Sequence, residues 1–230
     1  ALEERSFNSL AINLSYGQNS RPGKMFDCNE PHRHKHEDAI GEIEAWLDWL
    51  KSAGVKNVIL AGHSRGGNQI ARFAAENQHE LVSKIVLIAP TIWSESQSAK
   101  SYKKFHSVDL KDIIYRAEQA VVSSNNATML KNVGILYCRN TQASPESLLS
   151  YYIPDNRFDT VTLFNKIGVP LLLVTGSEDK ISPNLDQKVE PMLENGKVMH
   201  VAVEGADHFF RDLFLEDVAD AMIELAIQKK

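Results

Sequence analysis

The sequence predicts an α/β fold, in which a mostly parallel sheet is flanked by helices. Short continuous apolar runs are typical of strands that are covered on both faces, and several such runs occur after residue 57. Amphipathic helical patterns lie between these runs or follow them. This alternation is typical of a parallel sheet, because each helix returns the chain to the same end of the sheet. The strands are expected at residues 58–61, 85–89, 171–175 and 198–203.

The first helix is predicted by apolar side chains that recur every three or four residues between residues 40 and 50. Charged residues take the intervening positions, and Gly54 is expected to end the helix. Further helices are expected directly after Gly66, around residues 185–193 and through residues 218–225. The apolar stripe of the first helix consists of Ile40, Ile43, Leu47 and Leu50.

Two segments before the first helix have other patterns. The apolar run at residues 10–14 predicts one more buried strand. Residues 18–36 contain Arg-Pro-Gly, Asn-Glu-Pro and many charges, which are typical of a surface loop.

The alternation breaks between the second and third of the four strands. We expect a lid insertion at approximately residues 91–168, over the carboxyl ends of the strands of a single domain that spans residues 1–230. Within the lid, we expect a helix at residues 109–122, a turn at residues 123–126, and a polar, irregular stretch at residues 141–156.

Composition excludes several classes of protein. The net charge of −5 comes from acidic and basic residues mixed along the chain, so no face is expected to attract nucleic acid or anionic lipid. The longest apolar runs are far shorter than the roughly 20 residues that span a bilayer. Cys28 and Cys138 can pair only once, and the sequence leaves open whether they form a disulfide and whether the compartment is cytoplasmic or periplasmic.

Residues 62–66 read Gly-His-Ser-Arg-Gly and carry the strongest chemical signal. The pattern Gly-x-Ser-x-Gly lies here between an apolar strand and an amphipathic helix, where it presents Ser64 as a nucleophile on a sharp turn. Both outer glycines are expected to avoid collisions with neighbouring backbone, and Gly67 to allow close helix packing. The N–H of Arg65, at the positive helix end, would stabilise an oxyanion. The alternatives are an ordinary glycine-rich connection and, less favoured without a Gly-Lys-Ser/Thr ending, a phosphate loop.

A serine nucleophile needs a base, and a carboxylate to orient that base. His208 follows the last expected strand and precedes the last helix, at the sheet edge where Ser64 is expected. Asp179 lies on the loop after the preceding strand. The order Ser, Asp, His differs from the orders in chymotrypsin and subtilisin. Glu178 and Asp207 are rival carboxylates, each next to a better-placed residue.

With these motifs, the sequence resembles members of the α/β-hydrolase superfamily from residue 10 to the C-terminus, apart from the lid. A narrower stretch, residues 16–49, is similar to poorly characterised bacterial hydrolase-like proteins. The resemblance implies that Ser64 is the nucleophile, Asp179 the acid, His208 the base and the Arg65 N–H one oxyanion donor. It therefore implies a carboxylesterase-like serine hydrolase that forms an acyl-enzyme on a small acyl substrate and needs no metal or organic cofactor. Thioester, lactone and amide cleavage and acyl transfer stay open.

The sequence departs from this superfamily at the second oxyanion donor. The superfamily takes that donor from a His-Gly-type loop after a strand that lies between the strands expected here at 10–14 and 58–61, and this chain has no such loop. We therefore expect an N-terminal segment that is missing from this sequence or supplied by a partner chain, unless those two strands pair directly. A non-catalytic or binding homologue is the alternative function.

Two weaker signals remain. His32, His34 and His36 alternate, so in an extended segment they would face one way and could bind a transition metal, but a solvated polar loop that caps the next helix is the favoured interpretation. Aromatic residues of the lid either line an acyl pocket or pack the lid together. They are Tyr102, Phe105, Tyr115, Tyr151 and Tyr152.

Overall fold

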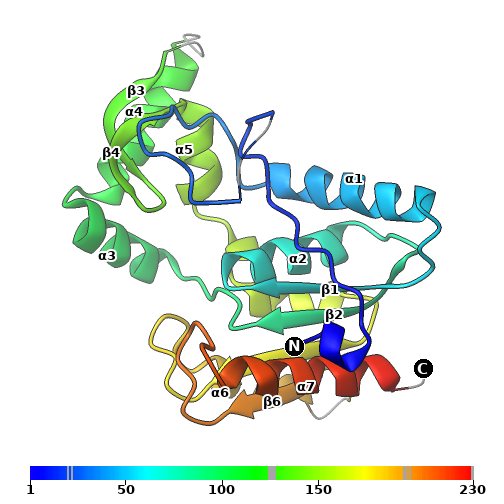
Figure 1. The fold of residues 1–230 in the computed structure, drawn as a ribbon. Coiled ribbons are helices and arrows are strands. Elements are labelled where there is room, and N and C mark those ends of the chain that lie inside the picture. The colour runs from blue at the N-terminus through cyan, green and yellow to red at the C-terminus, as the bar shows by residue number, and fades with distance from the viewer. Residues whose placement is uncertain (20, 22, 124–127, 194–195, 197, 229–230) are drawn as a thin grey trace. The chain divides into compact units, whose positions relative to one another are not determined.

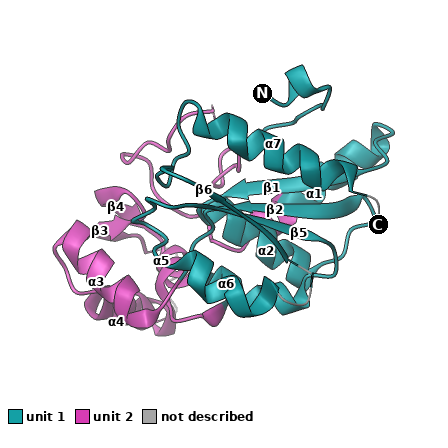
Figure 2. Cartoon of the chain, turned by 90° about the horizontal axis from the view of Figure 1, so that it is seen from below, with its two compact units in different colours: residues 1–11, 43–92, 157–230 teal, residues 12–42, 93–156 magenta. Residues whose placement is uncertain are grey.

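The computed structural model (Figure 1) describes residues 1–19, 21, 23–123, 128–193, 196 and 198–228. The chain forms two compact units, which Figure 2 distinguishes by colour. Unit 1 comprises residues 1–11, 43–92 and 157–230, and unit 2 comprises residues 12–42 and 93–156. Within the described parts of the chain, no helix combines the length and the apolar character that a bilayer crossing requires.

The described strands of unit 1 form one parallel sheet in the order β1-β2-β5-β6 (Figure 1), which confirms the predicted fold class. The middle parts of the inner strands are buried, as Leu87 and Leu173 show with exposed fractions of 0%. β1 lies at the edge of this sheet, and its Ala61 and His63 are exposed. The strands are β1 (Val58–His63), β2 (Val82–Ile88), β5 (Leu171–Gly176) and β6 (Val198–Val203).

The predicted helices of unit 1 are present, and α2 and α7 lie on opposite faces of the sheet (Figure 2). Val218 and Leu225 of α7 pack in one buried cluster with strand residues such as Val86 and Leu172. The buried Lys84 of β2 fixes the end of α7, because its ammonium group donates to three carbonyl oxygens there. The helices are α1 (Asp38–Ser52), α2 (Arg65–Glu76), α6 (Leu185–Leu193) and α7 (Phe214–Ile227), and short 3₁₀ helices span Glu3–Arg5, Asn156–Phe158 and Thr160–Lys166.

Unit 2 contains more regular structure than the sequence predicts. The expected helix at 109–122 is present as α4, but the stretch at 141–156 is not irregular: it contains the end of β4 and the helix α5. Ser144 begins α5 by accepting the N–H of Ser147, and Pro145 fits the first turn because it has no N–H to satisfy. Of the turn expected at 123–126, residues 124–126 lie outside the described residues. The elements are α3 (Glu95–His106), α4 (Leu110–Val122), β3 (Leu130–Ile135), β4 (Cys138–Ala143) and α5 (Pro145–Tyr152).

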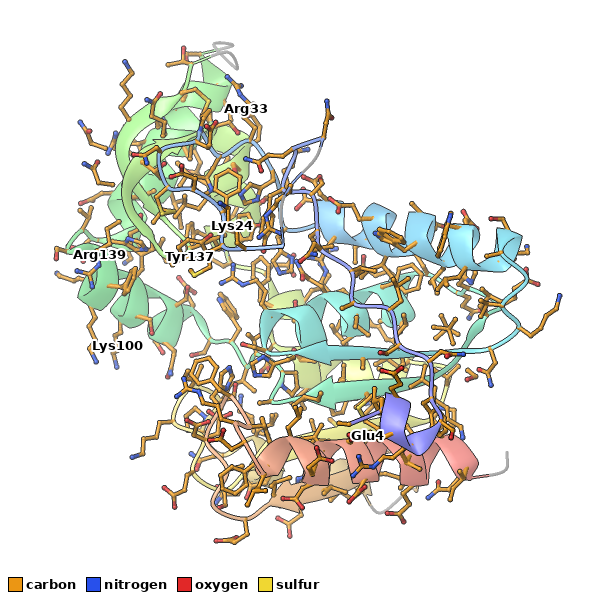
Figure 3. The ribbon with its side chains drawn as sticks, in the orientation of Figure 1. Glu4, Lys24, Arg33, Lys100, Tyr137 and Arg139 are labelled. Atoms are coloured by element: carbon orange, nitrogen blue, oxygen red, sulfur yellow. A yellow bond between two sulfur atoms is a disulfide. The ribbon has the colours of Figure 1, made fainter. Side chains whose placement is uncertain are left out.

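A disulfide between Cys28 and Cys138 answers the question that the sequence left open. It joins the loop that precedes α1 to the antiparallel β3–β4 hairpin, and hydrogen bonds add to this connection. The hydroxyl of Tyr137, a residue labelled in Figure 3, donates to the carbonyl of Phe26 at 2.9 Å. The N–H of His32 donates to the carbonyl of Gln142 at 2.8 Å. The loop before α1 is therefore a packed part of unit 2.

Two predictions about the N-terminal part are wrong. Residues 10–14 form no strand, and Leu10 and Ile12 are 48% and 36% exposed. An apolar run becomes a strand only where a neighbouring backbone satisfies its N–H and C=O groups, and no pairing with β1 occurs here. The segment 18–36 is largely irregular, as expected, but it is not wholly a surface loop because His32, His34 and His36 are buried.

Candidate active site

Ser64 lies on a sharp turn between β1 and α2. Its φ of 54° and ψ of −121° are strained for a residue with a side chain. Gly62 is required for close approach, because an added Cβ would lie 2.6 Å from the carbonyl oxygen of Gly66. Gly67 is tightly placed as well, with its Cβ position 3.0 Å from the Cβ of Pro90. The prediction that Gly66 avoids a collision is wrong, since a Cβ there would meet nothing within 4 Å.

Three predicted residues form one line of hydrogen bonds within unit 1. The His208 Nε2 lies 2.9 Å from the Ser64 Oγ, and the His208 Nδ1 lies 2.8 Å from the Asp179 Oδ2. Ser64 follows β1, Asp179 follows β5 and His208 follows β6, so all three occupy the carboxyl edge of the parallel sheet. The side chains of His208 and Asp179 are only 4% and 5% exposed, so water competes weakly for their contact.

Hydrogen bonds keep the Asp179 carboxylate ionised. Burial alone would raise its pKa, but bonds from the Ser182 N–H, from His208 and from the Ile181 N–H together outweigh burial and lower the pKa. The two backbone N–H groups lie 2.9 and 2.7 Å from Asp179 Oδ1. An ionised carboxylate accepts a hydrogen bond from the N–H at His208 Nδ1, so the proton stays on Nδ1 and Nε2 is free to accept the serine proton.

The rival carboxylates lie outside this line. The Asp207 carboxylate accepts the N–H of Phe209 at 2.8 Å, which is a local turn contact. Glu178 is exposed. Geometry therefore favours Asp179 as the residue that orients His208.

Arg65 is the first residue of α2, directly after Ser64. The N–H groups of a helix's first turn point out of its positive end and have no acceptor within the helix. The Arg65 N–H is thus placed as the superfamily resemblance requires, and its role as an oxyanion donor stays a prediction.

The histidine run does not form a metal site. Among the described residues no group of three or more His, Cys, Asp and Glu side chains could hold a metal ion. His32 and His34 bind each other instead, with 3.0 Å between Nδ1 and Nε2, and His34 Nδ1 lies 2.9 Å from the Tyr151 hydroxyl. The rings of His32 and Phe26 also pack against each other, with centroids 4.6 Å apart and planes tilted by 37°. The run belongs to the interior of unit 2.

Most of the aromatic residues assigned to the lid also have structural contacts. The Tyr102 hydroxyl donates to the Gly134 carbonyl at 2.8 Å, and the Tyr152 hydroxyl accepts the N–H of Leu136 at 2.7 Å. Phe105 and Tyr115 are 40% and 62% exposed. Tyr102, Tyr151 and Tyr152 therefore hold unit 2 together.

Asn68 is a residue near the site that the sequence analysis missed. It is 1% exposed, and its amide nitrogen donates to the Arg157 carbonyl at 2.9 Å and to the Thr160 hydroxyl at 3.0 Å. The Thr160 hydroxyl in turn donates to the carbonyl of Thr91, and the N–H of Thr91 donates to the carbonyl of Ser64. Asparagine is unfavourable inside a helix, which was the available signal. These bonds brace the turn that carries Ser64.

Comparison with known proteins identifies the family. Residues 30–217 match the family model described as "Serine aminopeptidase, S33". The chain belongs to this family of α/β hydrolases. The α/β-hydrolase fold expected from the motifs is thereby confirmed.

Solved structures of α/β hydrolases share the fold at low sequence identity. A monoacylglycerol lipase from Paleococcus ferrophilus is 18% identical, with a TM-score of 0.55 over 83% of this chain and 74% of that one. Est1E from Butyrivibrio proteoclasticus, solved with bound ferulic acid, is 16% identical, with a TM-score of 0.56 over 84% of this chain and 68% of that one.

Curated relatives match a shorter part of the chain. A 1-acylglycerol-3-phosphate O-acyltransferase of Arabidopsis thaliana is 33% identical over 96 residues, which are 41% of this chain and 21% of the relative. The abhydrolase domain-containing protein lid-1 of Caenorhabditis elegans is 27% identical over 115 residues, 45% of this chain and 28% of the relative. The match therefore spans between a fifth and a third of these relatives' length.

Proposed function

We propose that this α/β hydrolase is a serine hydrolase that cleaves carboxylic esters through an acyl-enzyme. The observation that carries the proposal is the line of hydrogen bonds from Ser64 Oγ through the His208 ring to the Asp179 carboxylate. The hydroxyl, the imidazole and the carboxylate have the order and spacing that serine activation requires.

The mechanism follows from which atom holds each proton. His208 Nε2 takes the Ser64 proton while Oγ bonds to the ester carbonyl carbon, and the carbonyl oxygen becomes an oxyanion near the Arg65 N–H. The C–O bond to the alcohol then breaks, and the alcohol leaves with the proton from Nε2. Water, deprotonated by the same nitrogen, attacks the acyl carbon; the bond from this carbon to Oγ breaks, Nε2 returns the proton to Oγ, and the carboxylic acid leaves. Asp179 stabilises the imidazolium in both steps.

The choice of an ester bond draws on the similar proteins. The structures similar to this chain include a monoacylglycerol lipase, and ferulic acid is bound to Est1E. A shared fold does not fix a substrate, so the bond that is cleaved has to be measured.

Hydrolysis of p-nitrophenyl acetate by the chain and by its Ser64→Ala variant tests the proposal. Ser52→Ala is a matched control, because Ser52 is an exposed serine whose hydroxyl binds only a local carbonyl among the bonds described for it. We expect the activity and the labelling by a fluorophosphonate to disappear in Ser64→Ala alone. No labelling of the parent chain would favour the alternative, a binding protein that does not activate Ser64.

We also infer that the open edge of β1 takes one further strand, from an N-terminal segment or from a partner chain, and that this strand brings the second oxyanion donor. Two observations support this. β1 pairs only with β2 among the described strands, and Ala61 and His63 are exposed although the run is typical of a fully covered strand.

Amide exchange tests this inference. The N–H of Ser64 donates to β2, so by alternation the N–H groups of Ala61 and His63 point away from β2. Slow exchange of these two amides, compared with an exposed loop amide, would show that the edge is covered. Exchange as fast as in the loop would refute the inference.

We propose, finally, that residues 93–156 act as the lid expected at 91–168. This interval lies between β2 and β5 in the chain, yet it clusters in unit 2 rather than with the sheet. A long-chain alkyl phosphonate on Ser64 should slow proteolysis within 93–156, whereas a methyl phosphonate should not. Equal cleavage rates would contradict a lid role.

A further inference from the structure

His63 precedes Ser64 in the chain, but its side chain contacts the loop of His208. The His63 Nε2 lies 2.7 Å from the backbone oxygen of His208. A carbonyl oxygen can only accept, so Nε2 carries the hydrogen and donates it. The two imidazole rings lie beside each other, with centroids 4.9 Å apart. The neighbour of the proposed nucleophile thus binds the backbone of the proposed base.

The loop that carries His208 has a conformation that needs external support. Phe210 and Asp212 have φ values of 47° and 56°, which are unfavourable for residues with side chains, and Gly205 has a φ of 76°. Such conformations persist where surrounding contacts determine them. One bond to the segment after β5 and one bond within the loop hold its two ends: the Gly205 N–H donates to the Ser177 hydroxyl, and the Phe210 N–H donates to the Asp207 carbonyl.

The bond from His63 differs from these because it comes from the strand that carries Ser64. His63 ends β1 and Ser64 follows directly, so the bond links the two backbones whose separation sets the 2.9 Å contact between His208 Nε2 and Ser64 Oγ. If the His208 loop moved away from Ser64, this bond would lengthen together with that contact. Resting on the proposed function, we propose that His63 is a positioning residue that holds His208 within proton-transfer distance of Ser64.

The expected effect is on turnover, because misplacement of reacting groups by about 1 Å lowers rates by up to about 100-fold. We expect His63→Leu to lower kcat about tenfold with KM within about twofold of the parent. His63→Gln, whose amide nitrogen can donate from nearly the same place as Nε2, should restore kcat to within about threefold of the parent.

His79→Gln is the matched control. Like His63, His79 forms hydrogen bonds through its ring nitrogens, but its partners are Asp48 and Leu81 rather than residues of the proposed active site. It should leave kcat and KM unchanged. Thermal midpoints of all variants show whether each one folds. A purely structural role would lower the midpoint of His63→Leu and His63→Gln alike without a difference in kcat between them, and this result would overturn the proposal.

A second measurement needs no substrate. The proton on His208 Nδ1 can be followed by NMR, since its hydrogen bond to Asp179 slows its exchange with water. The signal should be present in the parent and in His63→Gln and be broadened or lost in His63→Leu. An unchanged signal in His63→Leu would refute the positioning role. If the parent neither hydrolyses ester nor labels at Ser64, the proposed function fails, and the NMR comparison still decides the role of His63.

Discussion

Acid should destabilise the fold through His32, which lies in the interior of unit 2. Burial lowers the pKa of His32 from its ordinary value of 6.5 to about 4, and the side chain is 0% exposed. Between these two pH values the unfolded chain binds a proton that the folded chain does not, so the free energy of unfolding falls as the pH falls. The contribution is present in full above pH 6.5 and is lost as the pH approaches about 4.

The size of this effect follows from the two pKa values. Their separation of about 2.5 pH units corresponds to about 3 kcal/mol at most, and to about 2 kcal/mol at pH 5 relative to pH 7.5. Urea unfolding at pH 7.5, 6 and 5, followed by circular dichroism, measures the change. His32→Phe cannot take up a proton, so its unfolding free energy should fall by about 2 kcal/mol less than that of the parent over this range.

The difference between parent and variant is the decisive quantity, because other groups also titrate over this range. His79→Gln shows what the removal of a histidine outside unit 2 does, and the comparison with His32→Phe isolates the effect of His32. If His32→Phe lost as much stability as the parent between pH 7.5 and pH 5, protonation of a buried His32 would not be the cause. His32→Phe should also be less stable than the parent at pH 7.5, because His34 then loses its 3.0 Å partner.

Three further predictions concern the site and the two units. Asp179→Asn should lower kcat for p-nitrophenyl acetate by about 10³- to 10⁴-fold with little change in thermal midpoint, since the amide no longer orients and stabilises the imidazolium. A loss of kcat below tenfold would argue against Asp179 as the residue that orients His208. Gly62→Ala should lower the free energy of unfolding in urea by about 1–3 kcal/mol, because the new Cβ would lie 2.6 Å from the Gly66 oxygen. Gly66→Ala should be tolerated, and equal effects of the two variants would contradict the geometry of the turn. Reduction of the Cys28–Cys138 disulfide should lower the thermal midpoint. The two cysteines are 110 residues apart, so the free energy of unfolding should fall by up to about 4–5 kcal/mol when the loop between them is freed. A variant with serine at both positions should not respond to the reductant.

Local pattern was sufficient for the parallel sheet. Three of its four strands combine a continuous apolar run with a following helix, and in each case both signals lie in one stretch of the chain, as at 58–76, 171–193 and 198–227. Local pattern does not predict which strands pair with each other. The β3–β4 hairpin and the irregular course of residues 10–14 were both missed, because a strand is stable only where another backbone accepts its hydrogen bonds, and that backbone is not visible in the run itself.

The sequence by itself determined the strands of the parallel sheet and the residue types of the site: the Gly-x-Ser-x-Gly turn, an aspartate after β5 and a histidine after β6. Chemistry and chain order select those residues, since parallel strands place their carboxyl ends at one edge. Tertiary structure alone decided the 2.8 and 2.9 Å contacts of His208, the bond from His63 to the His208 backbone and the burial of His32. Each of these joins segments far apart in the chain, and their separation depends on packing that no local pattern encodes.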